Sequence, residues 1–257
     1  MAAGLVSAIA GFLGSLLGLG GGLFVTPLLS GPLGMPIHHA VAASIVAVIA
    51  TSSAGGSGYL KRGVPNVRLG MLLEVGTVLG AIVGTLLGGS LSANAIAGMF
   101  AVILVYTAVS MLHGNSERTV PADPLAVRLG LADDYPIGHL RLGLLISVFA
   151  GVISGLLGVG GGIIIVPMLV MMMGVPIKIA AATSTFMIGV TGVASAIIQV
   201  EQGNVDPLLA APVILGIFVG ATLGPRIAPK ISPALLRFLF LAAIGISVIQ
   251  MVQKAVA

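Results

Sequence analysis

The sequence predicts an all-α polytopic membrane protein built from two homologous four-segment repeats. Hydrophobic residues make up 58% of the chain and charged residues only 7%, whereas an average soluble domain carries about 25% charged residues. Too little charge remains to cover a water-facing surface, so a lipid bilayer must surround most of the protein. The second half also repeats the first, because Gly18, Gly20–Gly22 and Pro27 recur at an offset of 140 residues.

Each repeat contains four apolar segments, of which the first is the longest. The other three have the roughly 20 residues that a helix needs to cross a membrane. Three glycines interrupt each long segment, and each glycine costs a helix about 1 kcal/mol relative to alanine. We therefore expect breaks at Gly20–Gly22 and Gly160–Gly162, with Pro27 and Pro167 starting or kinking the helical half that follows. The expected segments are 3–31, 37–60, 69–89 and 93–113 in the first repeat, and 141–173, 177–200, 207–229 and 233–254 in the second.

The chain divides into three parts. Residues 1–113 form the first transmembrane repeat and residues 141–257 form the second. Residues 114–140 between them are polar and contain several prolines, so we expect a water-exposed cytoplasmic linker. Within this linker, residues 125–131 are expected to form one short amphipathic turn at the membrane surface.

The positions of charged residues indicate that the two repeats are inverted. The charged residues in the second loop of the first repeat are Lys61, Arg62 and Arg68. Those in the equivalent loop of the second repeat are Glu201 and Asp206, and it contains no Lys or Arg. The third loops show the opposite, since only the second repeat is basic there. Because basic loops mark the cytoplasmic face, equivalent loops are expected on opposite sides. Inversion requires an odd number of crossings per repeat, so each glycine-broken segment is expected to be a re-entrant hairpin.

The doubled glycine motif resembles that of a known transporter family. The stretches GFLGSLLGLGGGLFVTPLL and GVISGLLGVGGGIIIVPML are each followed by a Pro-Ile pair and an A-x-A-x-S pattern. This arrangement is similar to the TauE/SafE family, also called TSUP, of sulfite and organosulfonate transporters. The resemblance covers the chain apart from the central linker. It implies movement, often export, of a small sulfur-containing anion such as sulfite, sulfoacetate or taurine across the inner (plasma) membrane, without specifying which.

The broken helices provide the candidate substrate site. A helix N-terminus carries roughly half a positive charge, so two such termini facing each other can bind an oxyanion without a buried cation. No Lys or Arg lies in the middle of an apolar segment. The alternative for the glycines is close helix packing, and the alternative for the hydroxyls is a bond to their own helix. The predicted substrate-binding residues are Gly20, Gly21, Gly22, Ser44, Thr51, Gly160, Gly161, Gly162, Thr183, Ser184, Thr185 and Thr191.

Glu74 is the acidic residue expected inside the membrane. Intramembrane acids are expensive and usually functional, so Glu74 is the candidate proton-coupling residue; the alternative is a shallow position at the headgroups. Sodium remains open as the coupling ion. The absence of cysteine excludes thiol catalysis and thiolate metal sites. Because no carboxylates accompany His38 and His39, neither a metal nor another cofactor is expected.

These features predict a secondary transporter that moves its anion by alternating access. No acidic pair or histidine cluster lies within the apolar segments, which argues against an enzyme. A channel or permease for another small anion or a neutral solute is the alternative. The few basic residues form no stripe, so nucleic-acid binding is not expected. The oligomeric state stays open, because the face formed by Gly76, Gly80 and Gly84 can pack within one protomer or between two in a homodimer.

Overall fold

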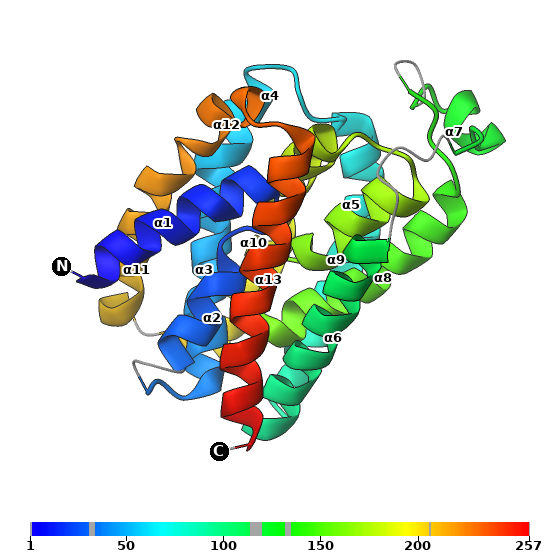
Figure 1. The fold of residues 1–257 in the computed structure, drawn as a ribbon. Coiled ribbons are helices and arrows are strands. Elements are labelled where there is room, and N and C mark those ends of the chain that lie inside the picture. The colour runs from blue at the N-terminus through cyan, green and yellow to red at the C-terminus, as the bar shows by residue number, and fades with distance from the viewer. Residues whose placement is uncertain (1, 31–33, 114–119, 132–134, 206, 257) are drawn as a thin grey trace.

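The computed structural model describes residues 2–30, 34–113, 120–131, 135–205 and 207–256, and these residues form helices without any strand (Figure 1). The first repeat comprises α1 (Ala2–Leu17), α2 (Gly22–Ser30), α3 (Ile37–Thr51), the π-helical η1 (Ser52–Gly56), α4 (Ser57–Leu60), α5 (Val67–Gly88) and α6 (Ala93–His113). The second comprises α8 (Leu140–Leu157), α9 (Gly162–Pro167), the π-helical η2 (Met168–Met172), α10 (Ile177–Glu201), α11 (Pro207–Ala221), α12 (Gly224–Ile227), the 3-10 turn η3 (Ala228–Lys230) and α13 (Pro233–Val256).

Each of the eight predicted segments corresponds to one helix or to a run of consecutive helices. Within the described residues, five helices are long and apolar enough to cross a membrane, and further apolar helices are shorter. The five are Ile37–Leu60, Val67–Gly88, Leu140–Leu157, Ile177–Glu201 and Ala211–Lys230. The chain is therefore an all-helical, multi-pass membrane protein, as the composition predicts.

Glycines break the first segment of each repeat, as expected. The backbone takes positive φ angles at Gly18 (76°), Gly20 (73°) and Gly21 (74°), and the equivalent residues of the second repeat do the same. Glycine tolerates this left-handed region because it has no Cβ. The breaks begin two residues earlier than predicted, since α1 already ends at Leu17, and Gly22 already belongs to the following helix.

The two prolines do not start the second helical half, which corrects one of the two expectations for them. Pro27 lies inside α2, and Pro167 ends α9 just before the π-helical η2. A proline has no N–H to donate to the carbonyl four residues earlier. In α2 this carbonyl belongs to Leu23, and the Ser247 hydroxyl of α13 donates to it at 3.2 Å instead. A tertiary contact thus compensates the lost helical bond.

The two repeats exchange their packing partners. α1 packs along α11 and α8 packs along α5, so the first helix of each repeat lies against the third segment of the other. α3 contacts α10, and α6 contacts α13. Gly76, Gly80 and Gly84 of α5 meet α8 between Leu144 and Val152, where a side chain at any of the three would collide. The glycine face of α5 is therefore used inside the protomer.

One hydrogen bond joins the residues that flank the broken segment of the second repeat. The Gly138 N–H just before α8 donates to the Met173 carbonyl just after η2, at 3.2 Å. Figure 1 shows α4, α7 and α12 at the top of the view, and we call this the α4 end. The C-terminus lies at the bottom. The end at which α10 finishes is called the opposite end.

The linker contributes one short helix, α7 (Pro124–Arg128), where the sequence predicts an amphipathic turn. Asp123 positions it, because its carboxylate accepts from the Leu125 N–H and from the Leu140 N–H, each at 2.9 Å. One side chain thereby caps α7 and ties it to the start of α8. The predicted linker residues 114–119 and 132–134 lie outside the described residues.

Candidate functional site

The two glycine breaks meet at the centre of the protein. We call residues 18–21 the first glycine loop and residues 158–161 the second glycine loop. A Cβ built on Gly22, next to the first loop, would lie 2.6 Å from the Gly158 carbonyl oxygen and 2.9 Å from the Val159 Cα. A Cβ on Gly162 would lie 3.0 Å from the Leu19 Cα. Only glycine permits this approach of backbone to backbone.

Two equivalent serines hold the glycine loops together. The Ser44 hydroxyl of α3 donates to the Gly158 carbonyl at 2.6 Å and also lies 3.2 Å from the Gly22 carbonyl. The Ser184 hydroxyl of α10 donates to the Gly18 carbonyl at 2.7 Å. Both serines are fully buried. Each repeat therefore binds the glycine loop of the other repeat through the same hydroxyl.

Two equivalent apolar side chains cover the loops. A Cβ on Gly20 would lie 2.6 Å from the Ile188 Cδ1 and 3.2 Å from the Val48 Cγ1. A Cβ on Gly160 would lie 2.7 Å from the Val48 Cγ1 and 3.2 Å from the Ile188 Cβ. Both side chains are buried. Sequence reasoning missed this pair, although its 140-residue offset is the signal that marks the glycines and serines.

The start of each second half-helix presents backbone donors. The N–H groups of Phe24 and Val25 donate to the Gly21 carbonyl, and those of Ile164 and Ile165 donate to the Gly161 carbonyl. The preceding N–H groups, at residues 21–23 and 161–163, have no protein acceptor among the hydrogen bonds of the described residues. Such unpaired donors at a helix start match the chemistry of an anion site.

The other predicted hydroxyls have local partners. Thr51 donates to the Ala47 carbonyl of its own helix at 3.1 Å, and its oxygen would lie 3.3 Å from a Cβ on Gly21. Thr185 lies within hydrogen-bond distance of the Ala181 carbonyl (2.8 Å) and of the Ser15 carbonyl (3.1 Å). Bonds back to their own helix, the alternative given for these hydroxyls, are thus present at both threonines.

Thr183 and Thr191 lie away from the glycine loops. The Thr183 hydroxyl oxygen accepts from the Asn66 N–H at 2.9 Å, near the α4 end. Thr191 donates to Glu74 Oε1 at 2.6 Å. The atoms nearest a Cβ on Gly161 belong to Ala150 and Ser154 and not to Thr191. The structure therefore brings together the glycines, Ser44, Thr51 and Ser184. It places Thr185 against the Ser15 carbonyl of α1 and leaves the other two threonines in separate clusters.

Glu74 lies inside the protein between α5 and α10. Its second oxygen, Oε2, accepts from Thr77 at 3.0 Å, and the residue is only 7% exposed. The carboxylate is therefore enclosed by protein side chains. The described residues give the carboxylate no Lys, Arg or His partner, and they contain no group of His, Asp and Glu that could hold a metal ion.

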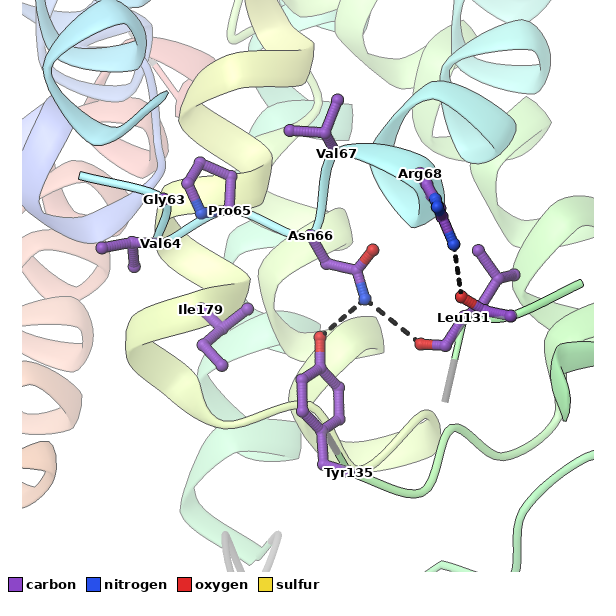
Figure 2. Close-up of a pocket in the computed structure, with 10 residues that line it drawn as sticks. Gly63, Val64, Pro65, Asn66, Val67, Arg68, Leu131, Tyr135 and Ile179 are labelled. Carbon is purple, nitrogen blue, oxygen red and sulfur yellow. Dashed lines mark hydrogen bonds between the residues drawn. The ribbon is translucent and has the colours of Figure 1, made fainter. Parts of the chain in front are cut away.

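A cavity of about 360 Å³ opens at the α4 end, between the α4–α5 turn and the linker (Figure 2). The Asn66 amide donates to the Tyr135 hydroxyl at 2.9 Å and to the Leu131 carbonyl at 3.3 Å. Arg68 donates to the Gly130 carbonyl at 3.2 Å. The Asn66 side chain also caps α5 by accepting from the Leu69 N–H at 3.0 Å. The sequence signal for the capping role of Asn66 was an asparagine directly before an apolar helix.

The family model "Sulfite exporter TauE/SafE" matches residues 3–251, a range that includes both glycine loops. The chain belongs to the TauE/SafE family. A probable membrane transporter protein, YunE of Bacillus subtilis, is 25% identical over 84% of this chain and 83% of its own length.

Two other relatives carry the same general name. A probable membrane transporter protein of Methanocaldococcus jannaschii, MJ0441, is 29% identical over 74% of this chain and 68% of its own length. A probable membrane transporter protein of Haemophilus influenzae is 28% identical over 76% of this chain and 72% of its own length. No solved structure matches this chain. The comparisons therefore identify a TauE/SafE membrane transporter family member and specify neither its substrate nor its mechanism.

Proposed function

We propose that this protein is a secondary transporter that moves small sulfur-containing anions, such as sulfite or an organosulfonate, by alternating access. The observation that carries the proposal is the meeting of two glycine loops whose following helices start with unpaired backbone N–H groups at residues 21–23 and 161–163. Sulfonate and sulfite oxygens accept hydrogen bonds from such donors. The family to which the chain belongs supports the sulfur-anion class.

The proposed topology has inverted repeats and re-entrant glycine segments. The bond between Gly138 and Met173 supports re-entry, because it joins the two ends of the broken segment. Charge distribution supports inversion. The loop that holds Lys61 and Arg62 follows α4, and Lys178 at the start of α10 donates to the Pro229 carbonyl of η3 at 3.1 Å, so these basic regions share the α4 end. The equivalent loop of the second repeat follows the other end of α10.

Alternating access requires the central contacts to open on one side at a time. In the present arrangement the Ser44 and Ser184 hydroxyls bind loop carbonyls, and Val48 and Ile188 cover Gly20 and Gly160. We propose that movement of one repeat releases one serine bond, so that this hydroxyl becomes a donor to the anion together with the loop N–H groups. The bond of the other serine to its glycine loop stays intact during this step and keeps the path to the opposite side of the membrane closed.

A channel for a small anion or a neutral solute is the alternative function. The contact between the two glycine loops and the apolar cover formed by Val48 and Ile188 favour the transporter, because a channel needs a continuous path in its conducting state. Saturable flux and counterflow of labelled substrate distinguish the two. A transporter shows both, whereas a channel shows flux proportional to concentration and no counterflow.

The decisive experiment is flux into proteoliposomes that contain the purified chain. Labelled sulfite, sulfoacetate and taurine are offered with and without a pH gradient. We expect saturable flux of at least one anion, and its loss in the Gly21→Leu and Gly161→Leu variants. Gly98→Leu is the matched control, since Gly98 of α6 has no neighbouring atom within 4 Å of the added Cβ. Absence of flux for all three anions with folded wild-type protein would refute the substrate class.

A further inference from the structure

Polar residues recur at every fourth position along α10. Thr183, Thr191, Ser195 and Gln199 share one face of this helix with Met187, because residues four apart lie one above another. All are at most 5% exposed. Burying four polar residues on one face of a membrane helix is costly.

Glu74 lies beside this row of side chains, and its environment is polar without being charged. It accepts from Thr191 of α10 and from Thr77 of its own helix. The charged residues of the packed helices all lie near helix ends: Arg68 on α5, Arg141 on α8, and Lys178 and Glu201 on α10. In the described part of these three helices, the side chains that hydrogen-bond the carboxylate are hydroxyls, and no charged side chain does so.

The row continues from Glu74 to the opposite end of the protein. The Ser195 hydroxyl, one turn beyond Thr191, is buried and has no hydrogen-bond partner. One turn further, the Gln199 side-chain oxygen accepts from the Asn204 amide at 2.7 Å, and His39 Nδ1 lies 2.8 Å from the Asn204 carbonyl oxygen. Side chains four apart are separated by about 5–6 Å between Cβ atoms, a gap that one water molecule bridges.

The row is interrupted in the other direction. Met187 lies between Thr191 and Thr183 and is 1% exposed. Its side chain packs toward Gly70 of α5, since a Cβ there would lie 3.4 Å from the Met187 Cγ. Beyond it, Thr183 accepts from the Asn66 N–H at the edge of the cavity in Figure 2. An apolar side chain thus separates Glu74 from the cavity at the α4 end.

We propose that Glu74 is the coupling proton site and that it exchanges its proton with the opposite end through Thr191, Ser195 and water held by Gln199, while Met187 blocks exchange with the α4 end. This inference rests on the proposed transport function and names its coupling path. In each transfer a hydronium ion at the mouth near Asn204 loses one proton and the Glu74 carboxylate gains one. The Ser195 and Thr191 hydroxyls and the water molecules that bridge them each give one hydrogen and take another, so they finish unchanged. The Gln199 amide hydrogen-bonds the water at the mouth and passes no proton itself.

The geometry favours a proton over sodium. The distances from Glu74 to Thr191 and Thr77, 2.6 and 3.0 Å, are those of hydrogen bonds, and Thr191 and Thr77 lie 3.2 Å apart. A cation between these oxygens would have to separate them. The same bond links Glu74 to α10, which also carries Ser184 and Ile188, so a change in the charge of Glu74 acts on the helix that holds and covers a glycine loop.

The first test is gradient-driven accumulation in proteoliposomes. One proton per monovalent anion supports about tenfold accumulation for each pH unit of the gradient, since a tenfold ratio of either species carries the same free energy. We expect Glu74→Gln to lose this accumulation and to retain counterflow of labelled anion. Ser195→Val should slow proton-driven uptake at least about fivefold, which corresponds to about 1 kcal/mol in the barrier to proton transfer.

Thr85→Val is the matched control for the path. The Thr85 hydroxyl is likewise buried without a hydrogen-bond partner, but it faces Gly155 of α8 and lies off the row on α10. Its loss should leave uptake unchanged. The proposal is overturned if Glu74→Gln still accumulates anion in a pH gradient, if Thr85→Val slows uptake as much as Ser195→Val, or if a sodium gradient drives a transport that depends on Glu74.

A second test does not depend on transport. Dicyclohexylcarbodiimide reacts with a protonated carboxyl to give an acylurea, which mass spectrometry locates in the peptide that contains Glu74. After a rapid rise in pH, protection of Glu74 should develop quickly in the wild type and in Thr85→Val, and slowly in Ser195→Val. If the three proteins show this pattern of protection but wild type transports no anion, the proposed function is refuted and the proton path stands. If Glu74 becomes protected at the same rate in all three proteins, the proton path is refuted.

Discussion

The contact between the glycine loops is tested most directly by adding one methyl group at Gly22. Gly22→Ala would place a Cβ 2.6 Å from the Gly158 carbonyl oxygen, 2.8 Å from the Ser44 hydroxyl and 2.9 Å from the Val159 Cα. Ordinary contact begins at 3.4 Å, so the two loops must separate by roughly 0.8 Å. Two of these three neighbouring atoms are backbone, which cannot rotate away.

The expected change in the free energy of unfolding combines two costs and one gain. Overpacking of this kind costs about 1–3 kcal/mol. Displacing the Gly158 carbonyl weakens its 2.6 Å bond from Ser44, at a cost of about 1 kcal/mol. Alanine recovers about 1 kcal/mol of helix propensity, because Gly22 is the first residue of α2. The net destabilisation expected for Gly22→Ala is therefore about 1–3 kcal/mol.

Circular dichroism, recorded while the protein unfolds in detergent, measures this loss of stability. The method needs no tryptophan, which the chain lacks. Gly98→Ala provides the reference, since it makes the same change in a helix with no atom within 4 Å, and it should be neutral or stabilising. Gly161→Ala isolates backbone strain of about 1–2 kcal/mol, because its φ is 74° and its nearest neighbour is 3.6 Å away. Equal stability of the Gly22→Ala and Gly98→Ala variants would show that the loops are not in contact.

Three further predictions address the contacts around this centre. Ser184→Ala should lower the free energy of unfolding by about 1–2 kcal/mol by leaving the Gly18 carbonyl unpaired, whereas Ser57→Ala, an exposed hydroxyl bonded within its own helical stretch, should change it little in the same melt. Asn66→Ala should cost about 1 kcal/mol by removing the cap of α5, and a stability equal to wild type would contradict that role. Ile188→Ala should raise anion flux in proteoliposomes by thinning the apolar cover of the loops, and unchanged flux with folded protein would argue against such a cover.

The sequence alone predicted the helical segments and their glycine breaks, because these depend on local properties. Continuous apolar runs of about 20 residues require helices in a bilayer. Each glycine costs a helix about 1 kcal/mol relative to alanine, so a run of three favours a break. The family resemblance rested on the same glycines, and the match to the TauE/SafE model over residues 3–251 confirms it.

The partners of the predicted site residues depended on the tertiary structure. Ser44 and Ser184 were identified as site residues, but only the crossing of the two repeats shows that they bind each other's glycine loops. Thr191 was grouped with them by its repeat position, yet the neighbouring α5 gives it Glu74 as a partner. Repeat symmetry is a property of the sequence, and this packing departs from it where Ile214 takes the place of Glu74.

Contacts between segments far apart in the chain decided the remaining features. The residue types of Val48 and Ile188 do not distinguish them from the other apolar residues of their segments, and they cover the loops only because α3 and α10 lie side by side. The cavity beside Asn66 exists because the linker folds back onto the α4–α5 turn. Hydrophobicity and glycine content determine which segments enter the bilayer and where they break, whereas the neighbour of each buried polar group is fixed only when the helices pack.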